Sequence, residues 1–265
     1  MEWFYPESIQ DALNLVSRGY ILHAGGTGIL LGRRKTEGFI HLGRIPELHL
    51  IESVDDGIRL GAMVTYGEVV SFFKKLSKKH VLGTALSMAG TTPLRNRITI
   101  GGSLGFLPVW SDLIGPLVAL DAKIMIRGEN EGIYDALDFV KSPSLTKNSI
   151  ITHVTIRKKN TDGLYFRMTR TAVDFADFTI AIAGKDGLSI VVTGTRERVN
   201  RLHKLEEEIK STGLDHIEEK IERSWNITFS NSRIGSGEFR EHLAKVWLAR
   251  LLKKMGGSSG DQVKG

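Results

Sequence analysis

Two glycine-rich segments are the parts of this sequence whose composition is best suited to binding a ligand. They read AGGTG at Ala24–Gly28 and TIGGS at Thr99–Ser103, and each follows apolar residues typical of a strand. Adjacent glycines adopt positive φ and let main-chain amides approach an anion closely, which favours a diphosphate. The hydroxyls of Thr27, Thr99 and Ser103 would add donors.

An aspartate downstream of the second segment extends this pattern. The carboxylate of Asp112 only accepts hydrogen bonds, so it is unsuited to a phosphate but suited to a ribityl or ribose hydroxyl. Neither segment is a P-loop, since no Gly-Lys-Ser/Thr follows, and neither reads GxGxxG. A glycine pair alone is more often a plain turn. Residue types by themselves therefore leave a turn and a dinucleotide site as alternatives.

The composition restricts the chemistry that the chain can carry. The sequence has 265 residues, a net charge of +6 and no cysteine. Disulfides, thiolate nucleophiles and cysteine-ligated clusters or zinc sites are excluded, and we expect no metal on this chain. Basic residues alternate with acidic ones, which indicates solvated helix faces rather than a nucleic-acid partner. The apolar runs are shorter than the roughly 20 residues of a membrane span, and no secretory signal is visible, so a cytoplasmic protein is expected.

Hydrophobic spacing predicts the elements that position the two glycine segments. A short amphipathic helix is expected within residues 6–20, and a strand, a glycine turn and an apolar continuation within 21–32. Strand-like alternation gives way to helical spacing within 57–75, and 117–128 is expected to be either a helix-to-strand transition or a buried strand. The first forty residues together suggest a small βαβ-like unit.

A turn-rich stretch at 160–163, NTDG, is the predicted domain boundary. Beyond it we expect alternating strands with a KDG hairpin turn at 185–187, then amphipathic stretches at Val199–Lys210 and Glu238–Met255. The tail 257–265 has the composition of a disordered linker. Strands and helices mix without strict alternation, so the predicted fold class is α+β.

Two further side-chain arrangements are expected near the boundary and the second segment. Arg170 and Asp174 interrupt an apolar stretch, which favours an internal ion pair between them. Trp110, in FLPVWSD, is expected either to stack on a ring system or to fill a subdomain or subunit interface.

Several motifs, in order along the chain, resemble the FAD-binding medium subunit of the molybdenum hydroxylases, the family of carbon monoxide dehydrogenase and xanthine dehydrogenase flavoprotein subunits. These motifs are AGGTG, LGRIPEL, IRLGAMVTYGEV, LRNRITIGGSLG, SDLIGPLVALDA and the C-terminal SGEFREHLAKVWLARLL. The likeness extends from the first predicted helix to about Lys254.

The resemblance implies a vanillyl-alcohol-oxidase-like (PCMH-type) FAD-binding domain at 1–158, with subdomains at about 1–55 and 56–158. It implies a C-terminal flavoprotein domain at 163–256, α+β in class, with a small three-stranded antiparallel sheet and helices. It also implies a non-covalent FAD, gripped at its diphosphate by the two glycine segments. The implied site comprises His23, Ala24, Gly25, Gly26, Thr27, Gly28, Ile29, Thr99, Ile100, Gly101, Gly102, Ser103, Ser111, Asp112, Ile150 and Arg167.

Individual roles follow from the same resemblance. Asp112, preceded by Ser111, is expected near the sugar or ribityl hydroxyls, and Ile150 or Ile151 is expected to pack on the flavin or adenine ring. Arg167 is similar to a basic residue that favours a negatively charged reduced flavin. His23 is included for its position beside the first segment, although a strand residue with a satisfied ring is the alternative. No residue is predicted to be catalytic.

The implied function is electron transfer within a complex. A molybdopterin-binding large subunit would oxidise the substrate, a small subunit would carry two [2Fe-2S] clusters, and FAD on this chain would pass electrons to NAD or another acceptor. Two residues depart from the family pattern: Gly28 replaces an aspartate and Ser103 an asparagine, each costing about 1 kcal/mol if a hydrogen bond is lost. A flavin-free structural or assembly subunit that retains the fold is therefore the alternative.

Overall fold

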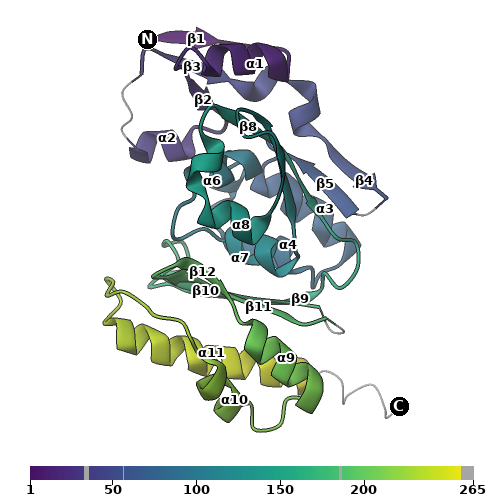
Figure 1. Ribbon diagram of the computed structural model, residues 1–265, viewed down its shortest axis with the longest axis vertical. Coiled ribbons are helices and arrows are strands. Elements are labelled where there is room, and N and C mark those ends of the chain that lie inside the picture. Colours follow the sequence, from purple (N-terminus) through teal and green to yellow (C-terminus); the bar gives the residue numbers. More distant parts are fainter. Residues whose placement is uncertain (33–35, 56, 185–186, 258–265) are drawn as a thin grey trace.

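The computed structural model describes residues 1–32, 36–55, 57–184 and 187–257, which form three sheets stacked along the long axis of the molecule (Figure 1). The first is a parallel sheet in the order β1-β3-β2, with β1 at Glu2–Phe4, β2 at Ile21–His23 and β3 at Gly38–His41. Helix α1 (Ile9–Val16) connects β1 to β2 and is capped by Ser8, whose hydroxyl accepts from the Asp11 amide at 3.1 Å.

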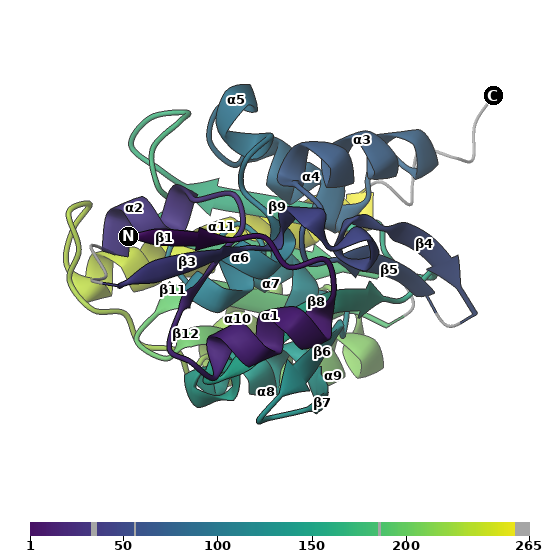
Figure 2. The ribbon, with the colours of Figure 1, turned by 90° about the horizontal axis from the view of Figure 1, so that it is seen from above.

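The second sheet has five strands in the order β4-β5-β8-β6-β7, and every neighbouring pair is antiparallel. The strands are β4 (Ile51–Val54), β5 (Gly57–Gly61), β6 (Lys123–Gly128), β7 (Gly132–Asp135) and β8 (Ser149–Ile156). Six helices lie around this sheet (Figure 2). They are α3 (Tyr66–Leu76), α4 (Val81–Met88), α5 (Thr92–Arg95), α6 (Ile100–Phe106), α7 (Ile114–Ala119) and α8 (Ala136–Lys141). The same part of the chain has the 3-10 turns η1 (Leu42–Arg44), η2 (Pro46–His49) and η3 (Pro143–Thr146). Helix α2 (Thr27–Gly32) lies beside α6.

The third sheet is antiparallel, in the order β12-β11-β10-β9, and lies between α7 and the C-terminal helices (Figure 1). Its strands are β9 (Gly163–Met168), β10 (Phe178–Ala183), β11 (Ser189–Thr195) and β12 (Arg198–Arg201), and the helices below it are α9 (His203–Thr212), α10 (Ile217–Ser224) and α11 (Gly237–Gly257). Every residue of β10 is buried.

Alternation along β10 explains why both of its faces are apolar. Ala181 and Ala183 belong to the core shared with the five-stranded sheet, whereas Ile180 and Ile182 belong to the core shared with the C-terminal helices. Successive side chains of a strand point to opposite faces. A single strand therefore contributes to two cores.

The structure confirms the α+β class and most predicted elements, including α1, β5 followed by α3, and α7 followed by β6. It corrects the second glycine segment, which was expected as a loop after a strand. Thr99 forms only an isolated bridge with Thr65, and Ile100 begins helix α6, because Thr99 caps that helix by accepting from the Gly102 amide at 3.1 Å.

The C-terminal sheet has four strands rather than three. The amphipathic stretch predicted at Val199–Lys210 is not a single element, because Arg198–Arg201 pairs with β11 as β12 and helix α9 starts at His203. A bulge between Thr193 and Thr195 and a positive φ of 71° at Arg198 form the tight connection. Lys185 and Asp186 of the expected hairpin turn, and 258–265 of the tail, lie outside the described residues. Within the described part, no helix is long and apolar enough to cross a bilayer.

Candidate FAD site

A cavity of about 830 Å³ lies where the three sheets approach one another. Its walls come from the N-terminal unit at 19–29, from the five-stranded unit around α6 and the start of β8, and from Arg167 and 173–175 beside the C-terminal sheet. The volume falls within the usual range for small-molecule sites. Segments far apart in the sequence therefore share one concave surface.

The two glycine segments meet in this cavity. A Cβ on Gly25 would lie 1.6 Å from the Arg97 carbonyl oxygen, so only glycine allows the two backbones to lie so close together. The Ala24 Cβ lies 3.7 Å from the Cβ position of Gly102, and a Cβ on Gly28 would lie 3.1 Å from the Phe106 ring. The expected convergence of the two segments is thus present.

The two segments differ in the amides that they leave available. Gly26 has a positive φ of 79°, and among the described residues no protein acceptor is bonded to the amides of Gly25, Gly26 or Thr27. In the second segment, by contrast, the four amides from Ile100 to Ser103 donate to Val64 O, Ala62 O, Thr99 Oγ1 and Thr99 O. The first segment is therefore the one that presents free donors to an anion, and the second supports it through close backbone contact.

Asp112 is a buried carboxylate in the wall of the cavity. Its Oδ1 accepts from the Tyr165 hydroxyl at 2.7 Å and lies 3.0 Å from Arg167 Nε. Burial raises the pKa of Asp112, while Arg167 and the Tyr165 hydroxyl act in the opposite direction. Both contacts fall on Oδ1, so among the described residues Oδ2 has no protein donor and can accept from a ligand hydroxyl. Ser111 accepts from the Leu113 amide at 3.2 Å, which fixes the turn.

Both terminal nitrogens of the Arg167 guanidinium are hydrogen-bonded to main-chain carbonyls. Nη1 donates to Met88 O at 2.8 Å and to Ala172 O at 3.3 Å, and Nη2 donates to Asp174 O at 2.9 Å. These bonds hold 172–174 against the end of α4 and beside the cavity. The suggested effect of Arg167 on a reduced flavin remains a prediction.

Three aromatic side chains line the cavity close to one another. The rings of Trp110 and Phe175 are 4.7 Å apart, and the Phe106 ring lies 6.3 Å from that of Trp110. The expected ion pair between Arg170 and Asp174 is present at 2.9 Å, although the Arg170 side chain is half exposed rather than internal. Trp110 lines the cavity, so its ring is placed to contact a ligand.

Apolar side chains from the first sheet and from β8 also line the cavity. Tyr20 and Leu22 come from the segment around β2, and Ile150 and Ile151 come from the start of β8, next to the polar residues 146–149. Ile150 is fully buried and Ile151 nearly so, and both line the cavity. That one of them packs on a flavin or adenine ring remains a prediction.

Fourteen of the sixteen predicted site residues line the cavity: Ala24, Gly25, Gly26, Thr27, Gly28, Ile29, Thr99, Gly101, Gly102, Ser103, Ser111, Asp112, Ile150 and Arg167. His23 instead packs against the rings of Trp3 and His41 on the first sheet, and Ile100 is fully buried in the core. The Ser103 hydroxyl accepts from Tyr66 at 2.8 Å, so this residue is held by a buried bond. Sequence analysis did not identify Tyr66, Phe106 or Phe175, because their apolar surroundings are also typical of a core.

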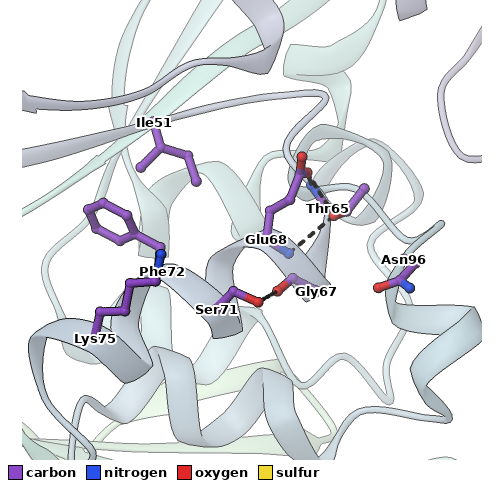
Figure 3. Close-up of a pocket in the computed structure, with 8 residues that line it drawn as sticks. All are labelled: Ile51, Thr65, Gly67, Glu68, Ser71, Phe72, Lys75 and Asn96. Carbon is purple, nitrogen blue, oxygen red and sulfur yellow. Dashed lines mark hydrogen bonds between the residues drawn. The ribbon is translucent and has the colours of Figure 1, made fainter.

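A second hollow of about 560 Å³ lies on the outer side of α3 (Figure 3). Several of its polar groups already have partners: Glu68 accepts from the Thr65 hydroxyl at 2.7 Å, and Ser71 donates to Gly67 O at 2.8 Å. These hydrogen bonds cap and continue helix α3, so Thr65, Glu68 and Ser71 have few hydrogen bonds left to offer a ligand. We therefore take the cavity between the sheets as the functional site.

Comparison with known families matches more than half of the chain to one family. The family described as the FAD binding domain in molybdopterin dehydrogenase matches residues 1–158, a range that contains both glycine segments and Asp112. This chain belongs to that family. The matched range also contains the cavity walls formed by α6 and the start of β8.

Two relatives of this FAD-binding family match nearly the whole chain. The glyceraldehyde dehydrogenase medium chain of Sulfolobus acidocaldarius is 24% identical, covering 94% of this chain and 96% of its own length. The nicotine 6-hydroxylase medium subunit of Paenarthrobacter nicotinovorans is 25% identical, covering 95% of each. The chain is thus similar, along nearly its full length, to two oxidoreductase subunits that are named the medium chain or medium subunit of their enzymes.

Solved structures share the fold. The quinoline 2-oxidoreductase of Pseudomonas putida 86 superposes with a TM-score of 0.84 at 21% identity, covering 97% of both chains. The carbon monoxide dehydrogenase of Hydrogenophaga pseudoflava gives 0.84 at 20% identity, covering 96% of both. The similarity includes the C-terminal sheet and helices, which lie beyond the family match.

Proposed function

We propose that this chain is the FAD-binding medium subunit of a molybdenum hydroxylase complex and passes electrons from iron–sulfur clusters on a partner, through FAD, to NAD or another acceptor. In this proposal 1–158 is the FAD-binding domain and 163–256 the C-terminal domain. The cytoplasmic location expected from the sequence belongs to the same proposal.

The observation that carries the proposal is the meeting of the two glycine segments and Asp112 in one cavity, within a chain of this FAD-binding family. The donor set fits FAD. Free amides at Gly25–Thr27 suit a diphosphate, a buried carboxylate oxygen suits a polyol chain, and apolar and aromatic wall residues suit two ring systems. No covalent attachment is needed for this set.

Each group would have a distinct task in holding the cofactor. The amides of Gly25–Thr27 would donate to the diphosphate, and Asp112 Oδ2 would accept from a sugar or ribityl hydroxyl. Ile150 or Ile151, and the aromatic pair of Trp110 and Phe175, would pack on rings and exclude water. FAD accepts electrons and releases them to an acceptor, and this chemistry belongs to the cofactor.

The partners follow from the family and from the composition. Without cysteine the chain cannot ligate an iron–sulfur cluster, so electrons must arrive from another subunit. We propose a small subunit with two [2Fe-2S] clusters as the donor and a molybdopterin-binding large subunit as the site of substrate oxidation. Co-expression with such chains, when neighbouring reading frames encode them, should yield a complex that purifies through a tag on this chain.

Fluorescence titration with FAD tests the cofactor assignment. Wild-type protein is expected to bind FAD, and Asp112→Asn to bind at least about tenfold more weakly, because a hydrogen bond to a charged group contributes roughly 1.5–3 kcal/mol. The exposed Asp215 offers a matched control, so Asp215→Asn should bind like wild type. Wild-type protein that ignores FAD would contradict the proposal and favour the flavin-free subunit.

Anaerobic reduction tests the acceptor. Protein loaded with FAD is expected to lose its flavin absorbance when mixed with NADH, since electron transfer between NAD and FAD is reversible. Flavin that dithionite reduces but NADH does not would contradict NAD as the acceptor and leave the cofactor assignment intact.

A further inference from the structure

A pair of histidines lies behind the first glycine segment. His23 and His41 are the last residues of two neighbouring parallel strands and stand opposite each other in the register. Their Nδ1 atoms are 3.4 Å apart and their ring centroids 5.4 Å apart. At this separation one Nδ1–H donates to the other Nδ1, so the neutral pair shares a single proton between the facing nitrogens.

One member of the pair, His23, is in direct contact with the turn that carries the free amides. A Cβ on Gly26 would lie 2.9 Å from His23 Nε2 and 3.7 Å from Arg97 Nη2. Arg97 also donates to Gly25 O from Nε at 3.3 Å and from Nη2 at 3.1 Å. Two basic side chains, His23 and Arg97, therefore lie against the Gly25–Gly26 unit.

The groups that face the histidines are neutral or positively charged. The Trp3 and Phe39 rings lie 4.9 Å and 6.1 Å from His23, and Tyr5 lies 5.7 Å from His41. Burial, together with the positive charges of His41 and Arg97, lowers the pKa of His23. Within the described chain no salt bridge joins either ring to a carboxylate, and Arg44, over the Tyr5 ring, adds another cation nearby.

An anion at the turn would reverse this balance. Positive groups that repel one another in the free protein favour the neutral histidine pair, whereas a nearby dianion favours the protonated one. Protonation also strengthens the bond between the two rings, because a charged imidazolium is the better donor. The position of His23 outside the cavity is consistent with such an indirect role.

We propose that the His23–His41 pair takes up a proton from solvent when the diphosphate of FAD binds at the Gly25–Gly26 turn, so that the affinity for the dinucleotide rises as the pH falls. This inference rests on the proposed function. The uptake forms one imidazole N–H bond and adds one positive charge. It cannot exceed one proton per FAD, so the dissociation constant changes by at most tenfold per pH unit.

Titration calorimetry of the full-length, flavin-free protein with FAD tests the inference at pH 6.5. Measurements in two buffers of different ionisation enthalpy give the number of protons taken up. Wild type should take up more than zero and at most one proton per FAD, His23→Asn should take up none, and His41→Asn should take up less than wild type. His153→Asn is the matched control, since His153 is also half-buried with a pKa lowered by burial but lies on β8 near Arg59. This variant should keep the wild-type uptake.

The outcomes separate the inference from the function on which it rests. Wild-type binding without proton uptake, or uptake that survives in both pair variants, overturns the role of the histidines and leaves FAD binding in place. Absence of any FAD binding overturns the proposed function itself. His41→Asn serves as the second variant if His23→Asn does not fold, because His41 does not contact the glycine turn and its loss leaves His23 in position.

Discussion

His80 provides a test of how the buried interior responds to acid. This side chain is 3% exposed, its ring stacks on Phe73 with centroids 3.7 Å apart, and its Nδ1 accepts from the Gly83 amide at 3.4 Å at the start of α4. Its Nε2 is buried without a partner within the described structure. Burial lowers the pKa of His80 from 6.5 to about 4. The histidine is therefore held neutral in the folded protein.

The direction of the pH effect follows from this shift. Between pH 6.5 and pH 4 the unfolded chain binds a proton at this position and the folded chain does not, so stability falls as the pH falls through that range. A pKa shift from 6.5 to about 4 lowers the free energy of unfolding by roughly 3 kcal/mol over the full pH range, at about 1.4 kcal/mol per pH unit. By pH 5 we expect a loss of about 2 kcal/mol from this one group.

Urea unfolding at pH 7.5 and pH 5 measures the effect. In His80→Asn the asparagine keeps an N-cap acceptor for α4 but does not titrate. From pH 7.5 to pH 5 the free energy of unfolding of this variant should therefore fall by about 2 kcal/mol less than that of wild type. Substitution of the exposed His242 by asparagine is the control and should behave like wild type. Equal losses in His80→Asn and wild type would refute the reasoning.

Three further predictions concern the cavity walls. Gly25→Ala should lower the free energy of unfolding in urea by at least about 2 kcal/mol, because its Cβ meets the Arg97 carbonyl at 1.6 Å, whereas Gly105→Ala, with open space around its Cβ, should be neutral or stabilising. Arg167→Leu should destabilise by about 3 kcal/mol, since it leaves Asp112 buried without its ion pair, and the additional change Asp112→Asn should restore part of this loss in the same assay. Phe175→Ala should release FAD several-fold faster in a stopped-flow dilution, and an unchanged rate would contradict ring packing by Phe175.

Local sequence predicted the parts of the fold that depend on neighbouring residues. The apolar spacing in Ile9–Val16 gives the amphipathic α1, and the glycine pairs mark the places where backbones come close. The resemblance to a known family indicated that the two glycine segments serve one site, and the structure brings them together.

Contacts between distant residues account for what the sequence did not reveal. The amides from Ile100 to Ser103 bond to Ala62, Val64 and Thr99, so tertiary pairing turned a β-branched stretch into a helix start. The same holds for Arg97, which reaches Gly25 across 72 positions, and for the meeting of His23 with His41. Neither the spacing nor the type of these residues indicates a partner so far along the chain.

The double burial of β10 has a consequence for how the molecule unfolds. Removing residues beyond 158 would expose the apolar surface of α7 that now packs on this strand, and removing the first 162 would expose the alanine face of the strand itself. Each fragment would then carry a water-exposed hydrophobic seam and tend to aggregate. The flavin-binding and C-terminal portions should accordingly melt together in one cooperative transition, despite having separate sheets.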